Sequence, residues 1–212
     1  MPFLFSHVLR SSGVIALIAQ LNVSLCYAEA PVDARVIYMQ KGVPIARTVG
    51  LGDPSNWSLV IQGRAGKSAS GKVEVSPTDY KGGGDAMQIK WSKKSEQGNF
   101  SMYGAAVDLT AFQKVANLVV EMRVDVMPDK PVSLGMDCGY PCGATVNLSN
   151  LIKSMPKGQW FGLPIPLSCF KSNNFDISKV VGPIVISTQG KLTLSLTNIH
   201  LEKMGPDDKG CE

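Results

Sequence analysis

Histidine is scarce in this sequence, which has only His7 and His200 among its 212 residues. A metal site built on several histidines is therefore excluded, because such a site needs at least two of them in the folded domain and His7 falls in a leader-like segment. A Ser-His-Asp triad would have to use His200. A lone histidine in a terminal strand is more typical of a sheet face or rim than of a catalytic base.

Long apolar runs are also missing. The stretch Gly13–Ala19 follows Arg10 and is too short to cross a bilayer, but it suits the apolar part of a signal peptide. We therefore predict a signal peptide over residues 1–30, a periplasmic or secreted protein, and no stable membrane anchor. The cleavage position stays open within Ala28–Ala30. Cys26 leaves a lipoprotein as an alternative, which the bulky leucine before it disfavours.

Runs of basic residues are absent as well. The 21 Lys and Arg residues exceed the 17 Asp and Glu residues only slightly, for a net charge of +4, and they are scattered among Gly and Ser. Nucleic acid is thus not an expected partner. After the signal peptide we expect a linker over residues 31–42, one domain over residues 43–203, and a disordered polar tail over residues 204–212.

Four cysteines remain in the exported part of the chain: Cys138, Cys142, Cys169 and Cys211. An even number in an oxidising compartment indicates disulfides rather than a metal or redox centre. We predict a bond between Cys138 and Cys142, because the Gly-Tyr-Pro segment between them is able to turn sharply. For Cys169 two alternatives stay open, a buried free thiol or a bond to Cys211.

Hydrophobic residues alternate with polar ones from residue 43 onward, which is typical of strands with one buried face. The longest example puts Leu118, Val120, Met122, Val124 and Val126 on one face and Val119, Glu121, Arg123 and Asp125 on the other. Near the C-terminus the alternation changes phase, which predicts a bulge at Thr197–Asn198 or a strand that crosses between sheets.

Helical patterns are limited to a turn at residues 111–113 and a short segment at residues 148–153. Gly- and Pro-rich turns separate many short strands, so the sequence predicts an all-β, jelly-roll-like antiparallel β-sandwich.

Candidate binding residues come from the aromatic and acidic side chains, because sugar-binding domains combine aromatic rings with polar groups that reach hydroxyls. Trp57, Trp91 and Trp160 stand in strand-like contexts and are predicted to be buried. Loops rich in Gly or Pro favour Tyr80 and Tyr140 as surface contacts. The candidate carbohydrate-binding residues are Tyr80, Asp85, Tyr103, Asp137 and Tyr140, and nothing indicates a cofactor or a metal.

A resemblance to a known family rests on three segments: Asp137–Gly143, then Gly158–Trp160, then Ile165–Phe170. They resemble the ExoP-type, galactose-binding-like C-terminal domain of glycoside hydrolase family three exo-glucanases and β-glucosidases. The resemblance extends over roughly residues 44–201. One departure is that Gly82–Gly84 precede Asp85 where the family tends to have a Gln.

This resemblance implies a non-catalytic, carbohydrate-binding-like accessory module, with a β-glucan-type saccharide as the expected ligand. The catalytic domains of those enzymes have no counterpart in the sequence. A first alternative is a module that docks on a glycoside hydrolase or an envelope partner without binding sugar. A second is a glycoside hydrolase that uses loop carboxylates, since Asp53, Asp79, Asp85 and Asp137 all fall in or beside loops. Asp residues in such loops more often form Asx turns.

Overall fold

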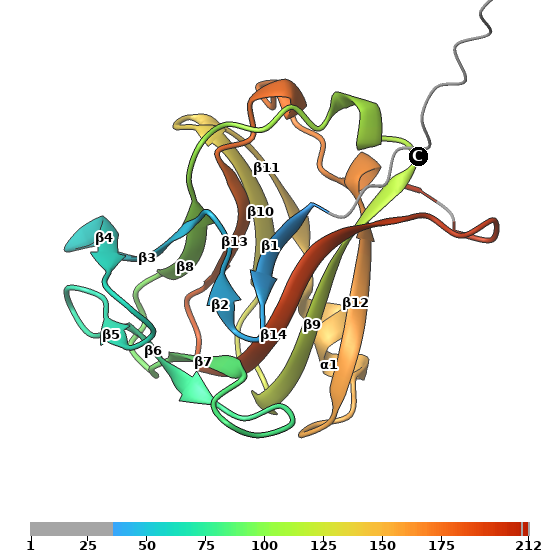
Figure 1. Ribbon diagram of the computed structural model, residues 1–212. Coiled ribbons are helices and arrows are strands. Elements are labelled where there is room, and N and C mark those ends of the chain that lie inside the picture. The colour runs from blue at the N-terminus through green and yellow to red at the C-terminus, as the bar shows by residue number, and fades with distance from the viewer. Residues whose placement is uncertain (1–35, 209, 212) are drawn as a thin grey trace, which may run out of the picture. The chain divides into compact units, whose positions relative to one another are not determined.

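Two antiparallel sheets contain nearly all the regular structure in the computed structural model, which describes residues 36–208, 210 and 211. Figure 1 shows the two sheets packed face to face, which confirms the predicted all-β sandwich. The predicted signal peptide, residues 1–30, lies outside the described residues. None of the helices in the described range has the length and apolar character that a membrane span requires.

The first sheet contains eight strands and both ends of the folded domain. Its main path runs in the order β12 (Trp160–Pro166), β9 (Ala116–Val126), β14 (Leu192–Lys203), β7 (Ala86–Trp91), β6 (Val73–Thr78) and β5 (Gly66–Lys67). In addition, β1 (Ile37–Gln40) pairs with β14, and β2 (Val43–Pro44) pairs with β1. The sheet therefore begins before the domain boundary predicted at residue 43, because β1 adds to β14 next to the bulge in that strand.

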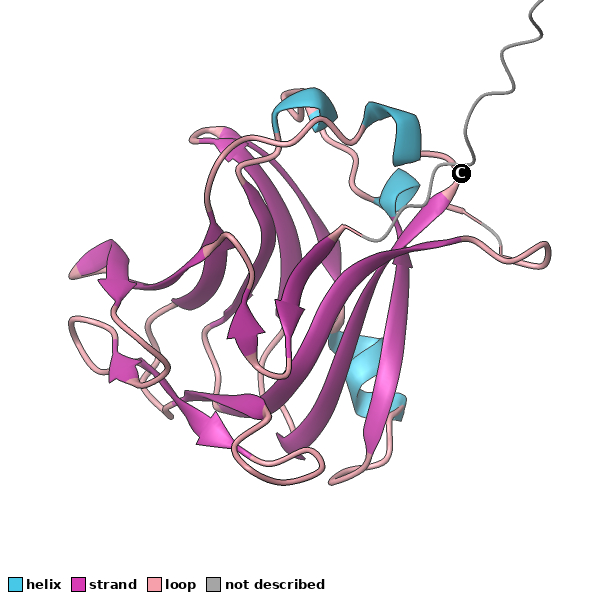
Figure 2. Ribbon diagram, in the orientation of Figure 1, coloured by secondary structure: helices cyan, strands magenta, loops and turns pink. Residues whose placement is uncertain are grey.

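The second sheet contains six strands from the middle of the chain. Its order is β11 (Cys142–Asn147), β10 (Val132–Gly139), β13 (Gly182–Thr188), β8 (Gly98–Tyr103), β3 (Thr48–Asp53) and β4 (Asn56–Ile61). Figure 2 shows that the helices of the described residues lie in connections between strands. They are η1 (Thr110–Phe112), α1 (Ser149–Ser154), η2 (Leu167–Cys169) and η3 (Ile177–Lys179), and the first two confirm the helical segments predicted from the sequence.

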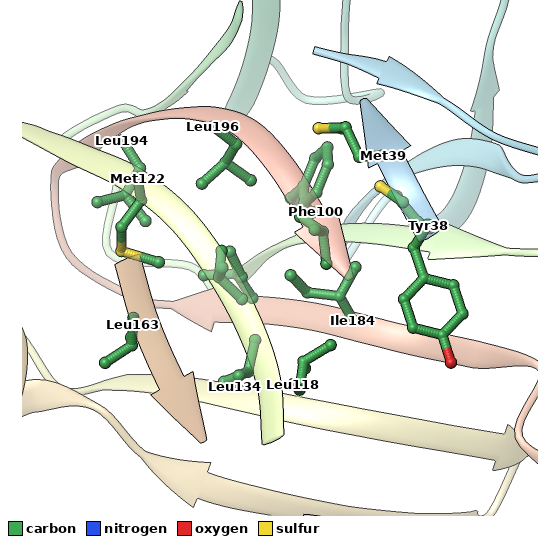
Figure 3. Packing of buried hydrophobic residues seen from close by; sticks show 14 of the residues in the cluster. Tyr38, Met39, Phe100, Leu118, Met122, Leu134, Leu163, Ile184, Leu194 and Leu196 are labelled. Carbon is green, nitrogen blue, oxygen red and sulfur yellow. The ribbon is translucent and has the colours of Figure 1, made fainter. Parts of the chain in front are cut away.

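The core lies between the sheets and follows the period of two. Leu118, Val120, Met122 and Val124 of β9 are fully buried, and Figure 3 shows residues of this strand and of β14 packed with Phe100 and Ile184 from the opposite sheet. Val126 was predicted to share this face, but it is 36% exposed. A register shift against β14 at this end of β9 changes the phase, so the last valine leaves the core.

A bulge in β14 confirms the predicted change of phase. The register with β9 shifts between Leu196 and Ile199, so that both residues and Leu201 are fully buried in spite of their different parity. The same register shift determines which residues after Leu196 point toward the core and which point toward solvent. His200 consequently faces outward, on the side away from the core.

Two disulfides close the fold at one end. Cys138 and Cys142 are bonded as predicted, and Cys169 is bonded to Cys211, which decides the alternative left open by the sequence. The tail expected to be disordered is therefore tied at Cys211. Asn117 also donates a hydrogen bond of 2.9 Å from Nδ2 to the carboxylate of Asp208.

Candidate functional site

Among the described residues, the outer faces of the two sheets carry recesses that differ in chemistry. Two of them lie on the six-stranded sheet, with volumes of about 430 and 260 Å³. Both are lined by Thr145 and Ser187, so together they form one groove along β10, β11 and β13, called here the groove. The third, of about 340 Å³, lies on the eight-stranded sheet beside Trp160 and is called here the Trp160 recess.

The groove is lined mainly by uncharged polar side chains. Its larger part has the hydroxyls of Ser133, Thr145, Ser187 and Thr188 and the carboxamides of Gln97, Asn147 and Gln189. Ser133, Thr145 and Ser187 alternate along their strands with buried residues such as Leu134 and Ile186, which explains why they face outward. Thr188, at the end of β13, is itself buried. The groove thus offers many neutral hydrogen-bonding groups on a rigid sheet.

Tyr140 stands at one end of the groove and is 98% exposed. The backbone around Tyr140 is fixed by neighbouring residues, whereas the ring is exposed to solvent. The disulfide between Cys138 and Cys142 closes the turn, and Asn174 donates a hydrogen bond of 2.6 Å from Nδ2 to the carbonyl of Pro141. A rigid, exposed ring costs little conformational entropy when a ligand binds to it.

Among the described residues, Asp137 is the only charged side chain that lines the groove. Its Oδ1 accepts a hydrogen bond of 2.6 Å from the backbone N–H of Gly139, which leaves the other carboxylate oxygen for a ligand. Tyr103 lies on the same sheet, on β8, and its ring covers Gly50: a Cβ at that glycine would come within 2.6 Å of Cε1. Three of the five predicted candidates thus lie on this sheet.

Of the other two predicted candidates, Tyr80 lines the Trp160 recess, and Asp85 lies in the loop that carries Tyr80. The loop between β6 and β7 wraps around the carboxylate of Asp85, which accepts hydrogen bonds from the N–H groups of Tyr80, Lys81 and Gly82. The hydrogen bond from Tyr80 has the largest influence on the pKa of Asp85, and together with the bonds from Lys81 and Gly82 it lowers this pKa against the opposing effect of burial. Asp85 therefore organises the loop that positions Tyr80.

Tyr80 reaches from this loop to Trp160 on β12. The ring centroids are 4.8 Å apart and the planes are inclined by 71°, an edge-to-face arrangement. The guanidinium of Arg123 stands 5.0 Å from the Trp160 ring, and the Lys81 ammonium stands 5.1 Å from the Tyr80 ring. Trp160 is therefore an outward-facing residue, and its predicted burial is wrong.

Hydrogen bonds across the sheet fix Arg123. In the β12–β9–β14 register, Trp160 pairs with Arg123, which pairs with Ser195. The carboxylate of Asp125 accepts hydrogen bonds from Arg123 Nε, Ser195 Oγ and Gln88 Nε2. This network holds the guanidinium against the Trp160 ring and neutralises its charge.

The floor of the recess contains Gly162, next to Glu121 and Val119. A Cβ at Gly162 would meet only the Val119 side chain, at 3.8 Å, so the missing side chain leaves open space rather than avoiding a clash. Glu121 accepts a hydrogen bond of 2.6 Å from Asn198 Nδ2. At the far end His200 Nε2 lies 3.9 Å from the Glu202 carboxylate.

Parity within β12 would have identified Trp160 as an outward residue. Leu163 and Ile165 are buried, so the even-numbered residues of the strand point outward. Trp91 is 1% exposed as predicted, but Trp57 is 52% exposed, because β4 is the last strand of its sheet. The polar face of β9 was predicted correctly, although Glu121 was not recognised as part of a recess.

Solved structures share this fold. An exo-1,3/1,4-β-glucanase (ExoP) from a Pseudoalteromonas species superposes with a TM-score of 0.68 at 20% identity, over 84% of this chain and 22% of that chain. The extra C-terminal domain (X) of the same enzyme gives a TM-score of 0.66 at 19% identity, over 82% of this chain and 95% of that chain. The present chain thus spans about a fifth of the whole exo-glucanase.

A family 30 carbohydrate-binding module of a Clostridium thermocellum cellulosomal cellulase gives a TM-score of 0.57 at 17% identity, over 82% of this chain and 99% of that chain. No curated protein matches this sequence. The pattern of the Exop_C family, described as galactose-binding domain-like, matches residues 50–201. The resemblance found in the sequence is thereby confirmed, and the chain belongs to the Exop_C family of galactose-binding-like domains.

Proposed function

We propose that this domain binds a neutral β-glucan-type saccharide in the groove and does not cleave it. The observation that carries the proposal is the lining of the groove, where one fixed, exposed tyrosine adjoins a row of hydroxyl and carboxamide groups. A pyranose ring has apolar C–H faces and a rim of hydroxyls, so it needs these two kinds of partner. The fold shared with carbohydrate-binding modules supports the same ligand class.

The shape of the groove indicates weak binding. It is an open feature on a sheet face, and its described lining has one aromatic platform rather than several. After the costs of association, such a surface supports dissociation constants of about 0.01–1 mM.

The carboxylates support a role without catalysis. A glycosidase needs a pair of acids across one cleft, and its general acid needs a raised pKa. Asp85 and Asp137 lie on different sheets, and the loop N–H groups lower the pKa of Asp85. Asp53 is fully buried. These aspartates thus suit turns better than hydrolysis.

Titration calorimetry with laminari- and cello-oligosaccharides tests the proposal. Thr145 is exposed and lines both parts of the groove, so Thr145→Arg should abolish binding without changing the melting temperature. Tyr140→Ala should weaken binding by about two- to ten-fold, the usual contribution of one aromatic contact.

Tyr80→Ala is the matched control, because it removes the same side chain from the opposite sheet. Equal losses in the two tyrosine variants, or full binding by Thr145→Arg, would place the site elsewhere. Incubation with the same sugars should release no glucose. Release that disappears in Asp137→Asn would instead identify an enzyme.

A docking function is the second candidate, and one observation favours it. Strand β4 is the free end of its sheet, contains no charged residue, and exposes Trp57 and Val60 by 52% and 44%. Uncharged edge strands are suited to pairing with another chain. No heat at millimolar sugar, together with loss of partner binding in Val60→Lys, would favour docking on a protein such as a glycoside hydrolase.

A further inference from the structure

The Trp160 recess carries more negative charge than the groove, whose lining has the single carboxylate of Asp137. Among the described residues, its lining contains two carboxylates, Glu121 and Glu202, and no Lys or Arg, although the whole chain has a net charge of +4. Two cations lie over the aromatic rings and not in the lining: Arg123, over the Trp160 ring, is paired with Asp125, and Lys81 lies over the Tyr80 ring. A ligand in this recess would therefore meet a negative, aromatic-walled surface.

The wall and the floor of the recess leave space for a ligand. Its wall is the edge-to-face pair of Tyr80 and Trp160, and three backbone N–H groups bound to Asp85 hold the loop that carries this tyrosine. Its floor has space at Gly162, where a side chain would fit without a backbone clash. The volume of about 340 Å³ lies at the small end of ligand sites.

We propose that the Trp160 recess is a second saccharide site, which takes an amino sugar. The apolar face of the sugar would pack against the two rings, and its ammonium group would lie near Glu121 and Glu202. Aromatic rings and carboxylates together favour a cation with an apolar body over a neutral sugar. His200 adds a further hydrogen-bonding group at the rim.

The two sites face in opposite directions, because each lies on the outer face of its own sheet. One short oligosaccharide therefore cannot occupy both. The domain would instead hold a neutral glucan on one side and an amino-sugar polymer on the other, and so join two polysaccharides. Amino-sugar binding in the recess does not depend on the proposed function of the groove, since the residues are separate, whereas the joining of two polysaccharides rests on both.

The test uses calorimetry on the Thr145→Arg protein, in which the groove is blocked. A fully deacetylated glucosamine tetramer should bind at least about ten-fold more tightly than cellotetraose of the same length. Added salt should weaken this binding, because the contact is ionic. The N-acetylated tetramer lacks the ammonium and should behave like cellotetraose.

Two variants assign the binding to the recess. In the Thr145→Arg protein, Gly162→Leu fills the floor of the recess and should abolish binding of the glucosamine tetramer. In the Gly162→Leu single variant, the groove is intact and cello-oligosaccharides should still bind. Glu121→Gln keeps the shape of the recess and should weaken glucosamine binding by about five- to ten-fold.

Either of two results would overturn the inference: no preference for glucosamine over cellotetraose, or glucosamine binding that survives Gly162→Leu. A failure of the groove proposal would be seen separately, as the absence of cello-oligosaccharide binding in the wild-type protein.

Discussion

Two regions of this domain hold charged side chains in opposite ways. At the loop end of the sandwich, Lys72 and Asp53 are fully buried. The Lys72 ammonium is within hydrogen-bond distance of four carbonyl oxygens, those of Ser92, Lys94, Gln189 and Gly190, at 2.6 to 3.2 Å. In the Trp160 recess, by contrast, Glu121 is half-buried and the Glu202 side chain is 65% exposed.

Hydrogen-bonding capacity explains the contrast. An ammonium has three N–H donors, and in Lys72 all of them are used by loops of the protein. Asp53 likewise accepts hydrogen bonds from the N–H groups of Ser55 and Ser70. The recess carboxylates have accepting positions left over. Charges without spare capacity hold the structure together, whereas charges with spare capacity are available to a ligand.

Replacing Lys72 should have the largest effect. Lys72→Met keeps the length of the side chain but leaves four carbonyl oxygens without their donor. Since a buried charged network is strongly destabilised when one partner is removed, we expect a loss of about 3–5 kcal/mol in the free energy of unfolding. Urea denaturation measures this loss.

Lys90→Met is the control, because Lys90 is exposed on the neighbouring strand β7. Its effect should stay within about 0.5 kcal/mol. A Lys72→Met protein as stable as the wild type would show that water replaces the ammonium, and that the distinction between the two regions is wrong.

Asp53 should give an intermediate effect that depends on pH. Burial raises its pKa, but hydrogen bonds from Ser68, Ser70 and Ser55 outweigh burial and lower the pKa from 3.8 to about 2. The folded state therefore binds its proton less readily than the unfolded state. The resulting stabilisation is complete above about pH 4 and is lost as the pH falls toward 2.

Asp53→Asn should thus cost about 2 kcal/mol at pH 7, and the difference from the wild type should shrink between about pH 4 and pH 2. Denaturation curves across this range measure it. Asp176 has a pKa that is also lowered to about 2, but its side chain is 41% exposed, so Asp176→Asn should have a much smaller effect. A difference for Asp53→Asn that stays constant with pH would contradict the assignment.

Alternation in the sequence was sufficient to predict the sandwich, the change of phase near Thr197–Asn198 and the outward face of β9, because these depend on residues within one strand. The candidate sites depend on which strands are neighbours. Tyr80 contacts Trp160 only because its loop extends to β12, and Thr145 and Ser187 line one groove only because β10 lies between β11 and β13. Strand order is set by packing of the whole chain, so the five candidates were predicted individually but not as two separate groups.

Asp85 shares features with both the buried charges and the exposed charges of the recess. Its replacement should have the smallest effect on stability. Its carboxylate is engaged by loop N–H groups, as in the buried class, but the loop is at the surface. Asp85→Asn retains one acceptor oxygen and loses the negative charge. We expect only a small fall in the free energy of unfolding, because exposed hydrogen bonds contribute little.

The effect on the recess should be easier to detect. A looser loop positions Tyr80 less well, so glucosamine-tetramer binding should weaken by about two- to five-fold in Asp85→Asn, whereas cello-oligosaccharide binding in the groove should not change. Calorimetry with both ligands on one protein preparation separates the two sites. Equal weakening of both ligands would mean that Asp85 stabilises the whole sandwich, and unchanged binding of both would mean that Tyr80 keeps its position without the carboxylate.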